Sequence, residues 1–193
     1  QPCIPIKDKP TARKEICVSR SFASPIDSPE ELDQAISKYI LIASAKLRKY
    51  NQLSSSITVF TNTNPHSEYF FRSKETVKLN TATANSRTMI EQSLKLTKKI
   101  FKPYNNLVKA GVILHKLQKN QYKQNLLFNE RDIQKNLNLE RLDNLIDTIN
   151  KRNRRETLGW GSSVIENDWS PSREKLSYLK TTTIENIPTV FAN

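Results

Sequence analysis

The chain has 193 residues, of which 36% are apolar, so it has room for one large domain or two small ones. Lys and Arg number 31 against 19 Asp and Glu, and this net charge of +12 predicts a polyanionic partner, with nucleic acid ahead of an anionic membrane surface. The longest apolar stretch, around residues 39–43, is far shorter than the roughly 20 residues of a membrane-spanning helix, which excludes a transmembrane protein. Cys3 and Cys17 are too few for a disulfide framework and predict free thiols in a reducing cytoplasm.

The first elements are marked by proline, by alternation and by a helix cap. Residues 1–14 contain three prolines and predict an extended linker. From residue 16 to residue 22 apolar and small side chains alternate, with Arg20 on the apolar side, and this period of two predicts a half-buried strand. Ser28 then precedes Pro29 and Glu31, the signature of a helix start, and an apolar stripe at helical spacing runs on to Tyr50.

The next elements complete a recognisable order. β-branched and aromatic residues at 56–61 and 69–80 predict two strands joined by the turn 62–65. Asn85 or Ser86 is expected to cap a second helix that Pro103 stops, and 107–117 is a further apolar strand. The resulting fold class is α+β, a four-stranded β-α-β-β-α-β sheet with two helices on one face, over residues 15–120. The opposite face of that sheet is then open to a ligand.

The positive charge is confined to this predicted sheet. Residues 1–120 hold 20 Lys and Arg against 9 Asp and Glu, whereas residues 121–193 hold 11 against 10. Residues 121–129 are a polar connector, and 130–193 begin with a helix near 130–151 and continue without clear periodicity, which predicts a small mixed α/β C-terminal domain.

Catalytic motifs are absent from the sequence. The acidic residues form no D-x-D or D-E pair on a predicted strand, and the three glycines build no phosphate-binding loop, so we assign no catalytic and no metal-binding residue. His66 in a turn and His115 at a strand end have no associated nucleophile and are interpreted as exposed or capping residues. Cys17 is interpreted as a small apolar residue within its strand.

Binding is better supported than catalysis. Arg20, flanked by Ser19 and Ser21, offers a charged fork and two hydroxyls to phosphate oxygens. Lys74 and Lys78 near the third strand and Lys109 at the start of the fourth extend this surface, although each of them alone is equally well explained as an ordinary solvated lysine. We expect all six to share one face of the sheet and to contact a nucleic-acid backbone without reading its sequence.

Several runs of residues occur in a characteristic order. They are Glu15–Phe22, Ser86-Arg87, Lys109–Val112, Arg155–Leu158, Trp169 with Arg173-Glu174 and Leu176-Ser177, and Thr181–Thr183 with Ile187-Pro188. Together they resemble the little-finger domain and C-terminal extension of UmuC-type Y-family DNA polymerases. The resemblance implies a non-catalytic part of an error-prone translesion polymerase of the bacterial SOS response, whose Ser19, Arg20, Ser21 and Lys109 approach the primer-template backbone. The chain itself would then be no enzyme and hold no cofactor, because Mg²⁺ belongs to the preceding palm domain, of which nothing corresponding is present.

A second motif lies in the connector. Gln124-Asn125-Leu126-Leu127-Phe128 resembles the peptide by which such polymerases bind the β sliding clamp, with Asn125 and Leu126 departing from its usual form. Gln124 would supply hydrogen bonds while Leu127 and Phe128 fill an apolar pocket. The alternative is that these apolar side chains pack under the helix that follows. The resemblance also implies a cytoplasmic, nucleoid-associated location and contacts with a processed UmuD dimer or a recombinase filament.

Two other hypotheses remain open. The first is a stand-alone RNA-binding adaptor of RRM type, which has the same β-α-β-β-α-β element order but would carry a glycine-containing aromatic strand motif. The chain has no glycine before Gly111, which argues against it. The second is a structural or protein-interaction domain whose basic residues serve only solubility.

Overall fold

The computed structural model describes residues 13–67, 70–103, 106–120, 130–153 and 157–163. The elements in chain order are β1 (Ile16–Ile26), α1 (Pro29–Lys49), β2 (Gln52–Thr63), β3 (Arg72–Thr83), α2 (Ser86–Ile100), β4 (Leu107–Lys119), α3 (Glu130–Asn153) and the short 3₁₀ helix η2 (Gly161–Ser163). The predicted linker 1–14 is described only from residue 13 on. The connector 121–129 and residues 164–193 lie outside the described residues.

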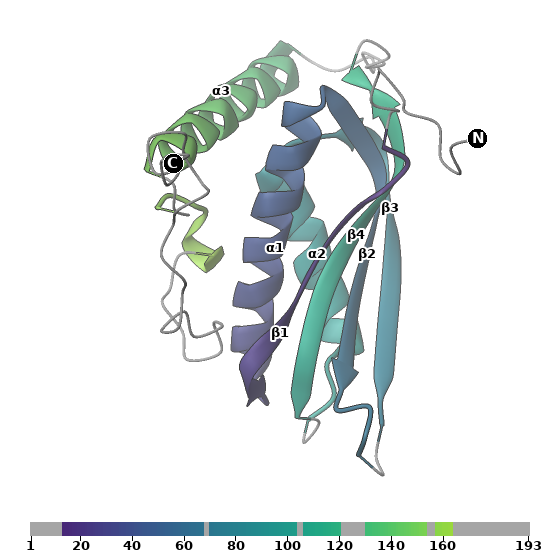
Figure 1. Ribbon diagram of the computed structural model, residues 1–193. Coiled ribbons are helices and arrows are strands. Elements are labelled where there is room, and N and C mark those ends of the chain that lie inside the picture. Colours follow the sequence, from purple (N-terminus) through teal and green to yellow (C-terminus); the bar gives the residue numbers. More distant parts are fainter. Residues whose placement is uncertain (1–12, 68–69, 104–105, 121–129, 154–156, 164–193) are drawn as a thin grey trace, which may run out of the picture.

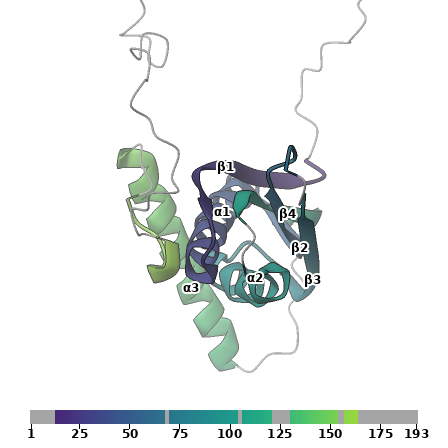
Figure 2. The ribbon, with the colours of Figure 1, turned by 90° about the horizontal axis from the view of Figure 1, so that it is seen from below.

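The four strands form one sheet in the spatial order β1-β4-β2-β3, with every neighbouring pair antiparallel (Figure 1). Both α1 and α2 pack on the same face of this sheet, which curls around them when viewed along the strands (Figure 2). This confirms the predicted β-α-β-β-α-β sheet with two helices on one face. The central strands are β4 and β2, and the first strand lies at an edge.

Local signals set the helix boundaries where the sequence predicted them. The Ser28 hydroxyl accepts a hydrogen bond from the Glu31 amide at 3.2 Å, and Pro29 occupies the first turn of α1. At α2 the cap is Asn85, whose side-chain oxygen accepts from the Thr88 amide at 2.9 Å. These caps satisfy amides that the first turn of a helix leaves without an intrahelical acceptor.

Three strands are longer than predicted and one is shifted. β1 ends at residue 26 instead of 22, β2 spans 52–63 instead of 56–61, and β4 ends at 119 instead of 117, whereas β3 spans 72–83 instead of 69–80. β2 lies between β4 and β3 and therefore makes ladder hydrogen bonds on both sides, so polar residues such as Ser54 and Ser56 are held in strand conformation. Pairing with neighbouring strands, which the sequence does not display, extended these elements.

The core lies between the sheet and the two helices. α1 contributes Leu32, Ile36 and Ile40, all fully buried, and the strands contribute residues such as Val59 and Val112. Burying one such side chain stabilises the fold by about 1.5–3 kcal/mol. The helix side of the two central strands, β2 and β4, is thus committed to packing, and their other side is left for solvent or a ligand.

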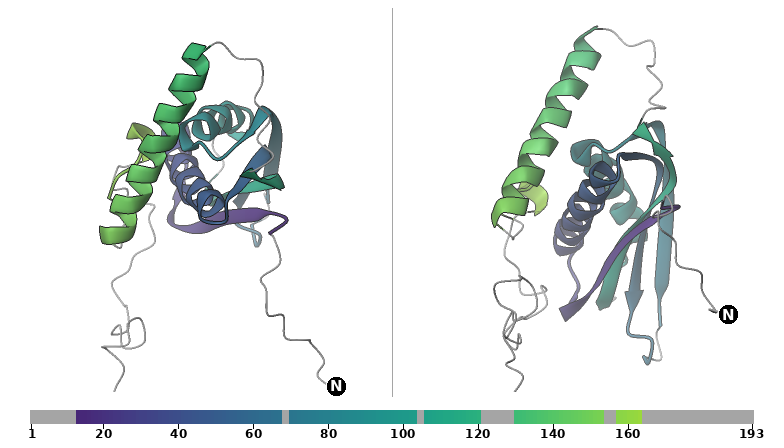
Figure 3. Two further views of the ribbon diagram at one scale, coloured as in Figure 1. Left: turned by 90° about the horizontal axis from the view of Figure 1, so that it is seen from above. Right: turned by 45° about the horizontal axis from the view of Figure 1, so that its top comes forward.

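α3 runs obliquely across the helical layer, on the side away from the sheet (Figure 3). The sequence predicted this helix over 130–151, and the structure extends it by two residues. Within the described part of the chain, no helix combines the length and the apolar character required to cross a bilayer.

Candidate nucleic-acid interface

Opposite the helices, the sheet presents a surface that we call the open face. Because paired residues in an antiparallel sheet point to the same side, the register assigns each strand's contribution. The open face consists of Cys17, Ser19 and Ser21 on β1, Lys109, Gly111, Ile113 and His115 on β4, Ser56, Thr58, Phe60 and Asn62 on β2, and Arg72, Lys74, Thr76 and Lys78 on β3. No helix in the described part of the chain lies over this face in any of the views (Figures 1–3).

Four cations gather on the open face. Arg72, Lys74 and Lys78 are exposed along the edge strand β3, and the half-buried Lys109 lies on β4, in the same cross-strand row as Arg72. Alternate residues of one strand are about 6.8 Å apart, so the three β3 cations form a line along one side of this face. Polar hydroxyls fill much of the area between them. Such a surface attracts an anionic polymer.

The carboxylate of Glu15, just before β1, is paired with a histidine of the open face. It accepts a hydrogen bond from His115 Nδ1 at 2.7 Å. The ionised carboxylate has no proton to donate, so Nδ1 carries the proton of this bond. His115 Nε2 lies 2.9 Å from Thr58 Oγ1, which is 2.7 Å from Thr76 Oγ1. This chain of contacts ties all four strands together across the open face.

Five of the six predicted backbone-contacting residues lie on the open face, but Arg20 does not. The register pairs Arg20 with Ala110, which is fully buried against the helices, whereas Ser19 pairs with Gly111 and Ser21 with Lys109. Arg20 therefore belongs to the opposite side of β1, where it is exposed because β1 is an edge strand. The expectation that Arg20 and Lys109 share one surface is wrong, because neighbouring residues of a strand point to opposite faces.

One smaller interpretation also changes. His115 is half-buried within the sheet network and neither freely exposed nor a cap, while His66 is exposed in a turn as expected. Cys17 lies within β1 and is a free thiol, both as the sequence predicts, and it is exposed on the open face. Among the described residues no group of three or more His, Cys, Asp or Glu side chains could hold a metal ion.

Phe60 and Arg72 are features of the open face that the sequence-based prediction did not include. Phe60 is half-buried at the centre of β2, and its ring reaches over Gly111 of the neighbouring strand. A Cβ atom at Gly111 would lie 2.5 Å from Phe60 Cζ and 2.5 Å from Ser19 Cβ, so glycine is required there. The signal was available, because Phe60 alternates in phase with the polar Thr58 and Asn62.

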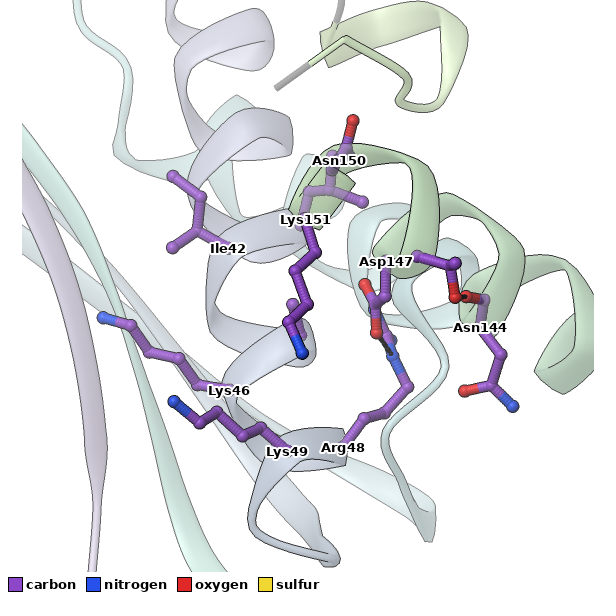
Figure 4. Close-up of a pocket in the computed structure, with 11 residues that line it drawn as sticks. Ile42, Lys46, Arg48, Lys49, Asn144, Asp147, Asn150 and Lys151 are labelled. Atoms are coloured by element: carbon purple, nitrogen blue, oxygen red, sulfur yellow. Dashed lines mark hydrogen bonds and ion pairs between the residues drawn. The ribbon is translucent and has the colours of Figure 1, made fainter. Parts of the chain in front are cut away.

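A separate groove of about 660 Å³ lies between α1 and α3, on the side of the helices away from the sheet (Figure 4). Arg48 closes one end, with Nε and Nη2 donating to the Asp147 carboxylate at 2.6 and 2.7 Å. Its Nη1 atom donates to the Ala84 carbonyl at 2.7 Å and lies 3.4 Å from Asp143. These contacts fasten α3 to the end of α1.

The Asp143 carboxylate is the most deeply buried charge of this junction. It is only 1% exposed and accepts hydrogen bonds from Asn85 Nδ2 at 3.2 Å, from the Ser86 amide at 3.0 Å and from the Ser86 hydroxyl. A carboxylate at the first residue of α2 also complements the helix dipole. The junction is structural, because each charged group in it has a partner.

Two family models match successive parts of the chain. Residues 13–127 match the impB/mucB/samB family C-terminal domain, and residues 140–190 match a domain of unknown function, DUF4113. Protein UmuC of Salmonella typhimurium is 30% identical over 184 residues, which cover 94% of this chain and 43% of that protein. Protein MucB of Escherichia coli is 29% identical over 188 residues, with coverages of 96% and 44%. The chain thus spans less than half the length of these curated relatives.

Two solved structures also align with the chain. The insertion ternary complex of Dbh DNA polymerase gives a TM-score of 0.46 at 15% identity, covering 55% of this chain and 29% of that one. The complex of β-clamp processivity factor and little finger domain of PolIV gives 0.41 at 16% identity, covering 58% and 97%. The family match, which covers more than half of the sequence, decides the assignment: the chain belongs to the impB/mucB/samB family, and residues 13–127 form the C-terminal domain of that family.

Proposed function

We propose that this chain is the DNA-binding and clamp-tethering part of a UmuC-like translesion polymerase that acts in SOS repair in the bacterial cytoplasm. The observation that carries the proposal is the open face, on which Arg72, Lys74, Lys78 and Lys109 lie together on a sheet surface without helical cover. Family membership is the second support. In this proposal the open face lies against the primer-template and grips its phosphates.

The arrangement of the cations favours contacts with the backbone over reading of base sequence. Lysine ammonium groups on flexible stems bind phosphate as point charges, and three of the four cations stand in a line along one edge strand. Sequence-specific readers place a helix or ribbon with bidentate side chains in the major groove. We therefore propose binding to any primer-template, with an affinity that falls steeply as salt increases.

The DNA contact is tested by a salt titration of fluorescent primer-template binding. We expect the double variant Lys74→Ala/Lys109→Ala to lower the slope of log K against log[salt] by about one for each phosphate that is no longer neutralised. The matched control is Lys95→Ala/Lys99→Ala, which removes the same charge from exposed positions on α2. Equal slopes for the two double variants, or no binding at low salt, would contradict the proposal.

Clamp tethering is proposed for Gln124, Leu127 and Phe128, which lie outside the described residues. The support is their resemblance to a clamp-binding peptide and their position at the end of the matched family domain. A tether raises the local concentration of a domain that binds DNA weakly, and it does so at the primer end without adding contacts to bases. Replacing Leu127 and Phe128 with Ala should abolish pull-down of the sliding clamp and leave DNA affinity unchanged, whereas retained pull-down would show that the peptide is wrongly assigned.

The catalytic step is proposed to reside in a part of the polymerase that this chain does not contain. The isolated chain with Mg²⁺ should then extend no primer, and incorporation would refute this division of labour. Residues 130–193 are proposed to contact a processed UmuD dimer or a recombinase filament, which co-purification with each partner separately would test.

A further inference from the structure

The centre of the open face is apolar, which contact with phosphates alone does not require. Phe60 on β2 and Ile113 on β4 are diagonal neighbours there, and Cys17 pairs directly with Ile113. Phe60 and Ile113 are both partly exposed and Cys17 is exposed. Phe60 is also outside the hydrophobic core and the apolar side chains packed against it, so it does not hold the helices to the sheet.

The Phe60 ring reaches over the neighbouring strand. Its far carbon, Cζ, is 2.5 Å from the position that a Cβ atom of Gly111 would take, and Cε1 is 2.8 Å from the same point. The ring therefore leans from β2 across β4, over a backbone position that has no side chain, and it remains partly exposed. A partly exposed ring in this position can serve as a stacking platform.

Cations surround this platform at the spacing of neighbouring rows. Lys74 pairs directly with Phe60, while Lys109 and Arg72 lie in the next row of the sheet, about 7 Å along the strands. The base of a nucleotide is separated from its phosphate by one sugar, so an aromatic ring with cations one row away can hold both groups. Proteins that bind single strands combine these two features, since aromatic rings stack on bases of any identity.

We propose that Phe60 is a stacking site for an unpaired base of a single DNA strand on the open face. This inference rests on the proposed function and narrows it, because a paired base inside a duplex has no free face to offer. Lys74, Lys109 and Arg72 hold the flanking phosphates, and Gly111 keeps the space that the ring requires. The open face then binds an unpaired template segment in preference to a fully paired duplex.

The test compares four fluorescent probes by anisotropy at matched salt: an oligo(dT) strand, an abasic strand of the same length, a blunt duplex of that length and a primer-template. We expect Phe60→Leu to weaken oligo(dT) binding about tenfold, since stacking on one base contributes roughly that factor. Binding of the abasic strand and the blunt duplex should not change. Phe60→Tyr, which keeps the ring, should bind oligo(dT) like the parent protein.

A spectroscopic readout complements the affinities. A Phe60→Trp variant should lose indole fluorescence on adding oligo(dT) beyond any change in the parent protein, which contains Trp160 and Trp169. The abasic strand should produce no such additional loss. These results would support stacking on the ring at position 60.

The inference is overturned if Phe60→Leu leaves oligo(dT) binding unchanged, or if it weakens the abasic strand equally. Failure of the proposed function gives a different pattern. In that case the parent protein binds none of the four probes at low salt, or Lys74→Ala/Lys109→Ala binds the primer-template like Lys95→Ala/Lys99→Ala. Normal duplex binding with no effect of Phe60→Leu would remove the stacking site and leave the phosphate contacts intact.

Discussion

The two faces of the sheet are made by alternate residues of the same four strands but differ in composition and burial. On the helix side, Val59, Val112 and Leu114 are buried and selected by packing. The open face instead carries lysines, hydroxyls, a glycine and one half-buried aromatic ring. A side chain that the core does not require is free to bind a ligand, and this freedom makes the open face the candidate interface.

Charged side chains are also arranged differently at the helix junction and on the open face. At the junction of α3 with α1 and α2, Arg48 is matched by Asp143 and Asp147 at short distances. On the open face several cations share a surface with Glu15, whose partner is His115. Matched buried charges hold a fold together, whereas an excess of one sign attracts a partner. Substitutions on the two sides should therefore separate stability from binding.

The largest expected effect is on the helix side. Arg48→Ala removes the cation next to the buried Asp143 carboxylate and should lower the free energy of unfolding by about 3 kcal/mol, because a buried charge loses its partner. Urea denaturation measures this loss. The control Arg87→Ala breaks an exposed pair with Glu91, 3.0 Å long, and should cost less than about 1 kcal/mol. A small loss for Arg48→Ala would mean that the junction contributes little to the fold.

The second effect concerns packing within the open face. Gly111→Ala places a methyl group 2.5 Å from the Phe60 ring and from Ser19 Cβ and should destabilise the protein by about 1–3 kcal/mol. Adding Phe60→Ala should recover part of that loss, because the ring no longer occupies the space. A double-mutant cycle in urea measures the coupling. Additive losses would show that the ring yields without cost.

A third prediction compares Lys109 with Arg20, which lie on opposite sides of the paired strands β4 and β1. Lys109→Ala should lower the salt slope of primer-template binding by about one, and Arg20→Ala should leave it nearly unchanged. Both variants remove one positive charge, so a general charge effect would act on them alike. A larger slope change for Arg20→Ala would place the DNA along the β1 edge and not on the open face.

The smallest effect concerns Asp33 on α1, which accepts a hydrogen bond from the Thr97 hydroxyl of α2. Burial raises the pKa of Asp33 above its usual value of 3.8, although Thr97 and Lys98 oppose the shift. The folded state therefore binds this proton more tightly than the unfolded state, and the resulting stability is lost as pH rises through the native pKa. Asp33→Asn should raise the melting temperature at neutral pH.

This gain from Asp33→Asn should shrink as the pH falls through the native pKa, because the parent carboxyl is then protonated as well. Melting curves at neutral and acidic pH measure the difference. A gain that does not depend on pH would point to packing and not to ionisation as its cause.

Much of the fold could be predicted because its signals are local. The caps Ser28 and Asn85 and the apolar stripe of α1 depend on residues within a few positions of one another. Strand ends were predicted less well, since β2 includes the polar residues Gln52, Ser54 and Ser55 only because neighbouring strands pair with it. The sequence predicts the place of Lys74, Lys78 and Lys109 on the open face correctly, and that of Arg20 wrongly. The alternation from Ile16 to Phe22 already places Arg20 with the core side, and this phase, not the proximity of Arg20 to Ser19 and Ser21, indicates its face.

By itself the sequence determined the order of the elements, the helix starts, the confinement of positive charge to residues 1–120 and the family that the chain resembles. Only the tertiary structure decided which cations meet, because the order β1-β4-β2-β3 joins distant residues in the rows of the open face, such as Cys17 and Ile113, which are 96 positions apart. It also decided that Gly111 makes room for Phe60 and that Asp143 of α3 caps α2. Contacts of this kind depend on strand pairing and helix docking, which bring distant residues together and leave no periodic trace along the chain.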